Sequence, residues 1–356
     1  MTPPRAPDAR KMLEMPRWHT AGIFFRARLA RHGAGPDIGP GSRPDSRQVR
    51  KVPLDAGFSC PNRDGAISTA GCSFCNPAGS GTGLFSQGLS LSAQWERLAP
   101  RARRRDPKAR LLAYLQAYSN THAAPERLRA VLAEVFALPE AAGLCLGTRP
   151  DCLDIGAGEE RLDILAASGF SFLQLDLGLQ SADDAVLALA NRGHGAELFA
   201  AAARAAASRG IFVCAHVMHG LPGAKADDLA RTVEFLNALP VAAVKFHNTL
   251  VCRGTALAAL WRAGGYAPPT REEYVAALVD ALSRLRPDIC VERLFADPAP
   301  GELLAPEWAS DRAGGKAAGL ALARAELVRL GMWQGCRSHC PDAPPDWSTC
   351  YKDGGT

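Results

Sequence analysis

The sequence has no run of eighteen apolar residues, which is the length that a membrane-spanning helix requires. Its first residues include Asp8, Glu14 and several arginines, and they lack the apolar stretch of a signal peptide. We therefore expect a cytoplasmic protein with no membrane partner. The eleven cysteines among 356 residues do not form a disulfide scaffold, and in a reducing compartment they remain thiols that can bind metal.

Acidic residues are scarce at the N-terminus. Residues 1–51 contain eleven Lys and Arg against four Asp and Glu, whereas the remaining residues carry a small net negative charge. Such an arm could attract a polyanion such as RNA, although charge alone slightly favours a solvated arm. Residues 33–48 are rich in Gly, Pro and Ser and predict a flexible linker. A second basic run that could extend the patch consists of Arg101, Arg103, Arg104, Arg105, Lys108 and Arg110.

Three cysteines, Cys60, Cys72 and Cys75, lie close together in the sequence without a nearby fourth. Three thiolates can hold three irons of a [4Fe–4S] cluster and leave the fourth iron open to a chelating molecule, whereas electron-transfer clusters normally have four cysteine ligands. Structural zinc is the alternative, because Cys-x2-Cys is half of many zinc sites. Phe74, between Cys72 and Cys75, favours the cluster because its ring can lie beside a purine.

Several short runs occur in the order typical of one enzyme family. They are Asp55–Gly65, Gln116–Tyr118, Gly147–Cys152, Leu177–Ser181, Asn191–His194, Gly220–Gly223 and Lys245–His247. With these runs the chain resembles the radical S-adenosylmethionine (SAM) enzymes over about residues 48–335, in particular the YhcC/YtqA-like group related to the elongator catalytic subunit. The eleven residues between Cys60 and Cys72 are an unusual spacing that makes the resemblance specific to this group.

The fold class that we expect is α/β. Short apolar runs alternate with alanine-rich helical stretches, which is the pattern of parallel β/α units. The resemblance implies a partial (β/α)6 TIM-like barrel at residues 48–290, preceded by a basic arm and linker at 1–47 and followed by a C-terminal extension at 291–356. The predicted strands are Val52–Leu54, Leu111–Gln116, Gly143–Leu146, Phe172–Leu177, Phe212–Met218 and Ala243–His247. Loops that follow barrel strands form the active-site face.

The resemblance also implies the cofactors and partners. These are a [4Fe–4S] cluster on Cys60, Cys72 and Cys75, SAM, and a reducing electron donor of the flavodoxin or ferredoxin type. The SAM-binding residues that it implies are Phe74, Gln116, Gln180, Arg192 and His216. Gln116 stands where many radical SAM enzymes have a Gly-Gly-Glu run, Asp176 where the group has Glu, and His216 where many relatives have an acidic residue.

Lys245 and His247 occupy alternate positions of the sixth predicted strand, so both point into the barrel. An inward Lys–His pair is costly unless it meets an anionic substrate, water or a partner carboxylate. We interpret the two residues as catalytic, in contact with substrate.

The C-terminal extension contains three thiols and an imidazole within fifteen residues: Cys336, His339, Cys340 and Cys350. They could bind zinc or part of a second cluster, but incidental cysteines are the favoured interpretation because the spacing matches no standard zinc finger. Glu292-Arg293 replaces a His-Arg pair that is common in the group.

The predicted function is reductive cleavage of SAM to a 5′-deoxyadenosyl radical that modifies a tRNA wobble-uridine side chain. The substrate follows from the resemblance, since the group and its elongator relatives are linked to wobble-uridine chemistry, and the basic arm is compatible with RNA. Two alternatives remain. One is radical chemistry on a small metabolite or a protein side chain, and the other is a non-catalytic metal-binding protein that interacts with RNA.

Overall fold

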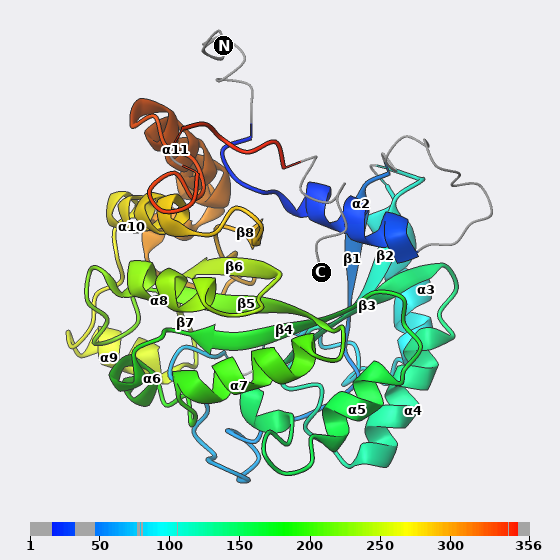
Figure 1. The fold of residues 1–356 in the computed structure, drawn as a ribbon. Helices are drawn as coiled ribbons and strands as arrows, with labels where there is room; N and C mark the ends of the chain where they lie inside the picture. Colours follow the sequence, from blue (N-terminus) through cyan, green and yellow to red (C-terminus); the bar gives the residue numbers. More distant parts are fainter. Residues whose placement is uncertain are drawn as a thin grey trace, which may run out of the picture.

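A curved, seven-stranded parallel sheet forms the centre of the molecule (Figure 1). The computed structural model describes residues 16–32, 47–76, 79, 81–104, 106–340 and 342–347. In sheet order the strands are β1 (Val49–Leu54), β2 (Arg110–Leu115), β3 (Ala141–Thr148), β4 (Leu173–Gln180), β5 (Phe212–His219), β6 (Ala243–Asn248) and β8 (Cys290–Arg293). The expected partial barrel is confirmed. Its sheet also contains β8, a four-residue strand that the sequence analysis did not predict.

Helices cover the convex face of this sheet and connect its parallel strands (Figure 1). They are α3 (Leu91–Ala102), α4 (Pro125–Phe136), α5 (Glu160–Ala166), α7 (Ala196–Ala207), α8 (Asp228–Asn237) and α10 (Arg271–Arg284). Two short helices, α6 (Asp184–Leu189) and α9 (Ala256–Arg262), pack outside this layer, α6 against Met218 and Leu221 and α9 against Val251. No helix among the described residues combines the length and the apolar character needed to cross a bilayer.

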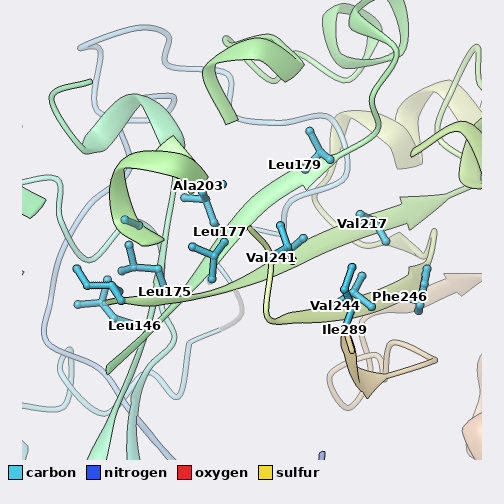
Figure 2. Close-up of a cluster of buried hydrophobic side chains, with 14 of the residues drawn as sticks. Leu146, Leu175, Leu177, Leu179, Ala203, Val217, Val241, Val244, Phe246 and Ile289 are labelled. Atoms are coloured by element: carbon cyan, nitrogen blue, oxygen red, sulfur yellow. The ribbon is translucent and has the colours of Figure 1, made fainter. Parts of the chain in front are cut away.

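Strand β4 shows how the sequence separates the two faces. Its residues read Leu-Gln-Leu-Asp-Leu-Gly-Leu-Gln, so that leucines alternate with polar residues or glycine. The leucines pack outward against the helices in one continuous apolar core, part of which Figure 2 shows. The alternate residues Gln174, Asp176, Gly178 and Gln180 therefore face the inside of the barrel, because successive side chains of a strand point to opposite faces.

The N-terminal end of the barrel is closed by α2 (Ala21–His32). Phe24, Phe25 and Leu29 are at most 5% exposed and pack against inward residues of the strands, including Phe172 and Cys214. Thr20 pairs with Val291 of β8, and the His19 carbonyl accepts a hydrogen bond from the Val291 amide at 2.8 Å. The sequence analysis placed residues 16–32 in a basic arm, but the aromatic residues of this segment make it part of the barrel.

The C-terminal extension packs beside this segment. It includes the short strand β9 (Leu303–Ala305), which pairs with β7 (Val251–Cys252), and helix α11 (Gly315–Arg329). The buried Gln334 side chain accepts a hydrogen bond from the His19 amide at 2.8 Å and donates to the carbonyls of Arg286 and Ile289. Trp347 is 2% exposed, so the chain is anchored well beyond α11.

Candidate active site

The loop after β1 carries the three cysteines at the end of the barrel opposite α2 (Figure 1). It contains turns rather than regular structure, with hydrogen bonds from the Arg63 amide to the Cys60 carbonyl at 2.8 Å and from the Cys75 amide to the Cys72 carbonyl at 3.0 Å. The Arg63 guanidinium donates to the carbonyls of Cys75 at 2.8 Å and Asn76 at 2.5 Å. Arg63 therefore joins the Cys60 half of the loop to the Cys75 half.

A second set of hydrogen bonds fixes this loop to the segment that follows α6. The side-chain amide of Asn62 donates to the backbone carbonyl of Asn191 at 2.6 Å, and the side-chain amide of Asn191 donates to the backbone carbonyl of Gly71 at 2.7 Å. The backbone N–H of Ser73 donates to the backbone carbonyl of Ala190 at 2.9 Å. Part of the Asn191–His194 run thus has a structural role in holding the cysteine loop.

Hydrogen-bond donors surround the thiol of Cys72. Its Sγ lies 3.5 Å from Asn62 Nδ2, 3.5 Å from Arg192 Nη1 and 3.9 Å from Arg149 Nη1. Burial alone would raise the pKa of Cys72, but the two guanidinium groups and the Asn62 amide outweigh burial and lower this pKa. The surroundings of Cys72 therefore favour a thiolate.

Cys75 lies close enough to the other two cysteines to interact with their charges. Burial raises the pKa of Cys75, and negative charge on Cys72 and Cys60 raises it further, against the opposing effect of Arg63. Three thiolates in mutual electrostatic range repel one another unless a cation lies among them. This donor set fits an iron cluster held by three thiolates.

Two of the expected SAM-binding side chains meet above Gly178, near the end of β4. Arg192 Nη2 donates to the Gly178 carbonyl at 2.8 Å, and Gln180 has a positive φ of 79°. A Cβ atom on Gly178 would lie 2.4 Å from Arg192 Nη2 and 2.8 Å from Gln180 Nε2. Glycine at this position is therefore what permits both side chains to approach the strand.

Phe74 and Gln116 are also brought to this end of the barrel. The half-buried Phe74 ring packs against two apolar groups, one with Met218 and Leu221 and the other with Leu257 and Ala305. Gln116 follows β2, and its side chain makes no hydrogen bond to any residue that the structure describes.

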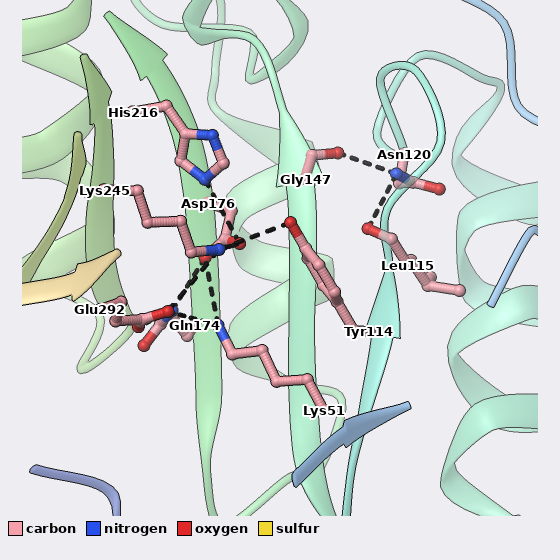
Figure 3. Close-up of polar contacts among 10 residues, drawn as sticks. All are labelled: Lys51, Tyr114, Leu115, Asn120, Gly147, Gln174, Asp176, His216, Lys245 and Glu292. Carbon is pink, nitrogen blue, oxygen red and sulfur yellow. Dashed lines mark hydrogen bonds and ion pairs between the residues drawn. The ribbon is translucent and has the colours of Figure 1, made fainter. Parts of the chain in front are cut away.

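Inside the barrel, Lys245 lies in a layer of compensating charges (Figure 3). Its Nζ forms a very short contact with Asp176 Oδ2 and lies 3.6 Å from Glu292 Oε2. Lys51 Nζ lies 2.7 Å from Glu292 Oε2 and 3.8 Å from Asp176 Oδ1. Gln174 Nε2 bridges the carboxylates, at 2.8 Å from Asp176 and 2.7 Å from Glu292. The layer therefore contains two ammonium groups and two carboxylates.

This charged layer explains how the barrel accommodates an inward lysine. Burial would raise the pKa of Asp176, but Lys245 and Lys51 hold that pKa well below its usual range. Burial would lower the pKa of Lys245, but Asp176 is the main cause of a net rise. Of the three partners that the sequence analysis allowed for Lys245, the structure supplies the carboxylate. The contributions of Lys51 and Glu292 were not predicted.

His216 and His247 stack directly above this layer, with ring centroids 5.2 Å apart and planes 26° apart. His216 Nε2 lies 3.4 Å from Asp176 Oδ2, and 22% of the His216 side chain is exposed. Burial lowers the pKa of His216 to about 4 despite this carboxylate, and burial also lowers the pKa of His247. Both rings are therefore neutral at pH 7.

The C-terminal thiols do not form a compact metal site among the described residues. There, three or more potential metal donors lie within 4.8 Å of one another only at Asp176, Cys214 and His216; the thiols of Cys60, Cys72 and Cys75 are spaced more widely than that. The Lys245 ammonium already binds Asp176, and burial raises the pKa of Cys214, so this group is better explained as packing inside the barrel. Cys350, one of the residues considered for a second metal, lies outside the described residues.

Comparisons with known proteins agree with this geometry. Residues 63–236 match the model of the radical SAM superfamily, and residues 241–317 match the model of the radical SAM C-terminal domain. Protein YhcC of Escherichia coli (strain K12) is 35% identical over 269 residues, which cover 75% of this chain and 84% of YhcC. The tRNA uridine(34) acetyltransferase of Dehalococcoides mccartyi is 28% identical over 158 residues, which cover 44% of this chain and 33% of that enzyme.

Among solved structures, an N-terminally truncated Elp3 from the archaeon Methanocaldococcus infernus has the same fold. The TM-score is 0.60 at 17% identity, and the match covers 80% of this chain and 64% of that one. The family uses a [4Fe–4S] cluster and SAM. Membership of this family argues against the alternative of a non-catalytic metal-binding protein. The chain therefore belongs to the radical SAM superfamily, in its YhcC/YtqA-like group related to the elongator catalytic subunit, and is an enzyme that cleaves SAM.

Proposed function

We propose that this radical SAM enzyme holds its cluster on Cys60, Cys72 and Cys75. The observation that carries the proposal is the Cys75 thiol in electrostatic range of Cys72 and Cys60, with two guanidinium groups and one amide directed at Cys72. A cluster held there would supply one-electron reductive chemistry: with an electron from an external donor, SAM would be cleaved to methionine and a 5′-deoxyadenosyl radical that abstracts hydrogen from the substrate. The protein contributes by binding, orientation and exclusion of water.

In this proposal SAM binds on the side of the cysteine loop that faces Gln180 and Arg192. Arg192 uses Nη1 and Nη2 in protein contacts, whereas its buried Nε has no hydrogen-bond partner among the described residues. That N–H is a donor suited to the SAM carboxylate. Phe74 provides an apolar surface beside which the adenine fits, and the free Gln116 amide can meet a polar group of SAM.

His247 and Lys245 have different roles in the proposed reaction. His247 Nε2 is buried and without a hydrogen-bond partner among the described residues, so it can bond to a substrate group above the charged layer. Because burial keeps the imidazole neutral, we assign it to a polar substrate group rather than to a fixed negative charge. Lys245 lies below, bound to Asp176, and positions His216 through that carboxylate. His216 stacks on His247 above the charged layer and remains a proposed SAM-binding residue.

We further propose that the substrate is the side chain of a tRNA wobble uridine. The similarity to a tRNA uridine(34) acetyltransferase over 158 residues supports this choice. Nucleoside mass spectrometry of tRNA from cells lacking the gene tests it. We expect the loss or accumulation of one modified uridine, reversed by the natural gene but not by Cys72→Ala. Unaltered tRNA nucleosides would return the substrate to the class of small metabolites or protein side chains.

A further inference from the structure

A basic groove lies at the N-terminal end of the barrel, where β1, β2 and β3 begin. Its volume is about 720 Å³, and its lining residues are Arg47, Arg103, Pro107, Lys108, Ala109, Arg110, Glu140, Ala141 and Ala142. Four of these residues are cationic and one is acidic. Arg101 and Arg104, in and just after the last turn of α3, add two more exposed cations beside the groove. Asp106, between α3 and β2, is a further carboxylate, next in sequence to the lining residue Pro107.

The cations of this basic groove form two groups. Some are fixed by the protein: Arg103 pairs with Glu140 at 2.5 Å, and Arg110 Nη1 donates to the Leu29 carbonyl of α2 at 3.0 Å. In contrast, the side chains of Arg101, Arg104 and Lys108 have no hydrogen bond or ion pair among the described residues. The first group therefore shapes the wall, and the second group offers uncompensated positive charge to a ligand.

The charge of this groove is large on the scale of the whole chain. Six cations, Arg47, Arg101, Arg103, Arg104, Lys108 and Arg110, face two carboxylates, Asp106 and Glu140, which leaves an excess of four. The whole sequence has a net charge of +5. The other local excess of positive charge lies in residues 1–51, which include Arg47, so the groove is one of two regions of the sequence that attract a polyanion.

The groove and the cysteine loop lie at opposite ends of the same strands. β1 runs from Val49, beside the groove, to Leu54, immediately before the cysteine loop, and its six residues span about 20 Å. A small phosphorylated molecule bound in the groove cannot reach the site at the far end. An RNA that extends along the β1 edge of the sheet can contact both.

We propose that the basic groove binds the phosphodiester backbone of the substrate RNA, remote from the nucleoside that reacts. This inference rests on the proposed function, because it assigns the RNA a second point of attachment. It follows that a full-length tRNA engages the groove, whereas a short stem-loop that fills only the active-site end does not.

The experiment measures binding of labelled full-length tRNA to the holoenzyme by fluorescence anisotropy over a range of salt concentrations. The test variant is Arg104→Glu/Lys108→Glu, since both side chains are exposed and free. The matched control is Arg204→Glu/Arg312→Glu, which makes the same change in net charge on exposed positions of other elements. Melting temperatures confirm that each variant is folded.

We expect the test variant to bind tRNA about tenfold more weakly and to reduce the slope of log affinity against log salt by about 1.4–1.8, as for two lost phosphate contacts. The control variant should keep the salt slope of the natural enzyme. A short stem-loop should bind the test variant and the control variant with equal affinity. An equal loss in test and control variants overturns the proposal. So does tight binding of pyrophosphate in the groove, which would make it a small-anion site. Nucleoside analysis of the deletion strain judges the proposed function separately.

Discussion

The two ends of the barrel are built from different kinds of residue. At the C-terminal end, a loop without regular structure is held by side-chain amides and guanidinium groups, such as Asn62, Arg63 and Asn191. At the N-terminal end, α2 places Phe24, Phe25 and Leu29 against an apolar layer. The reactive end thus depends on directional hydrogen bonds, and the closed end depends on burial of apolar surface.

Between these ends lies the charged layer of Lys51, Asp176, Lys245 and Glu292. It separates the apolar layer from the histidines and the cysteine loop, and its four charges compensate one another. A buried charge network contributes little net stability when intact, but is costly to break. We infer that the layer is a rigid polar support beneath the reaction site. Substitutions in the cysteine loop, the charged layer and the apolar layer each perturb one part of this arrangement.

The largest effect is expected at the cysteine loop. Cys72→Ala removes one of three thiolates, so the enzyme reconstituted without oxygen should lose its iron chromophore and its SAM cleavage completely. Iron analysis and absorption spectroscopy measure this loss. Cys290→Ala, in the apolar layer at the other end, is the matched control and should keep about four irons. Stoichiometric zinc in the natural enzyme, with no iron uptake, would contradict the cluster assignment.

A large loss of stability is expected when the charged layer is broken. Asp176→Asn leaves two ammonium groups beside one carboxylate, and we expect a loss of about 3–5 kcal/mol in the free energy of unfolding. Denaturant unfolding measures this loss. Asp297→Asn, which breaks an exposed pair with Lys316 at 3.0 Å, should cost only about 0–1 kcal/mol. Equal effects of the two substitutions would mean that the layer has no special role in stability.

The difference in the free energy of unfolding between the natural enzyme and Asp176→Asn should also depend on pH, which denaturant unfolding at several pH values measures. The folded pKa of Asp176 is depressed, so its stabilisation is present above the unfolded value of about 3.9 and is lost as pH falls through the folded value. The pKa of Lys245 is raised, so its contribution is present below about 10.4 and is lost as pH rises through the folded value. The stability difference between natural enzyme and Asp176→Asn should therefore be flat from about pH 5 to 9.

At the closed end, Phe24→Ala should destabilise the protein by about 3–5 kcal/mol, because the ring is 1% exposed and leaves a cavity against Phe25 and Phe172. Denaturant unfolding again provides the measurement. Phe136→Ala is the control, since that ring is 58% exposed, and it should have a much smaller effect. If Phe24→Ala behaved like the surface control, α2 would be a loosely attached arm after all.

The sequence predicts the reactive end better than the closed end, for a physical reason. The cysteines, Gly178 and Arg192 belong to short runs that are recognisable along the chain, although the contacts between these runs span up to 129 residues. Strand β4 is also recognisable, because leucine alternates along its length, although the predicted strand Phe172–Leu177 ends three residues before the observed one. By contrast, Lys51 meets Glu292 across 241 residues, and neither residue has a local pattern that indicates a partner. Strand β8 has only four residues, which is too short for an alternation of apolar and polar residues to indicate a strand.

Helix α2 was missed because its charges concealed its apolar residues. The segment Ala21–His32 contains four basic residues, and it shows no clear amphipathic period. Phe24 and Phe25 are adjacent in sequence, and both are buried because the helix end sits inside a barrel rather than on a flat surface. The aromatic pair was the available signal, but only the curvature of the sheet shows where it fits.

The smallest effect is expected for SAM binding at the reactive end. Arg192→Ala should weaken SAM affinity by about 1.5–3 kcal/mol, the value of a hydrogen bond to a charged group, while iron content stays at the natural level. Equilibrium binding to the anaerobic holoenzyme measures the affinity. Arg192→Lys keeps the charge but loses the planar fork that reaches both Gly178 and Cys72, so it should recover only part of the loss. If Arg192→Ala bound SAM normally but shifted the reduction potential of the cluster, the guanidinium would act on the Cys72 thiolate alone. The directional contacts of this end would then serve the cluster rather than SAM.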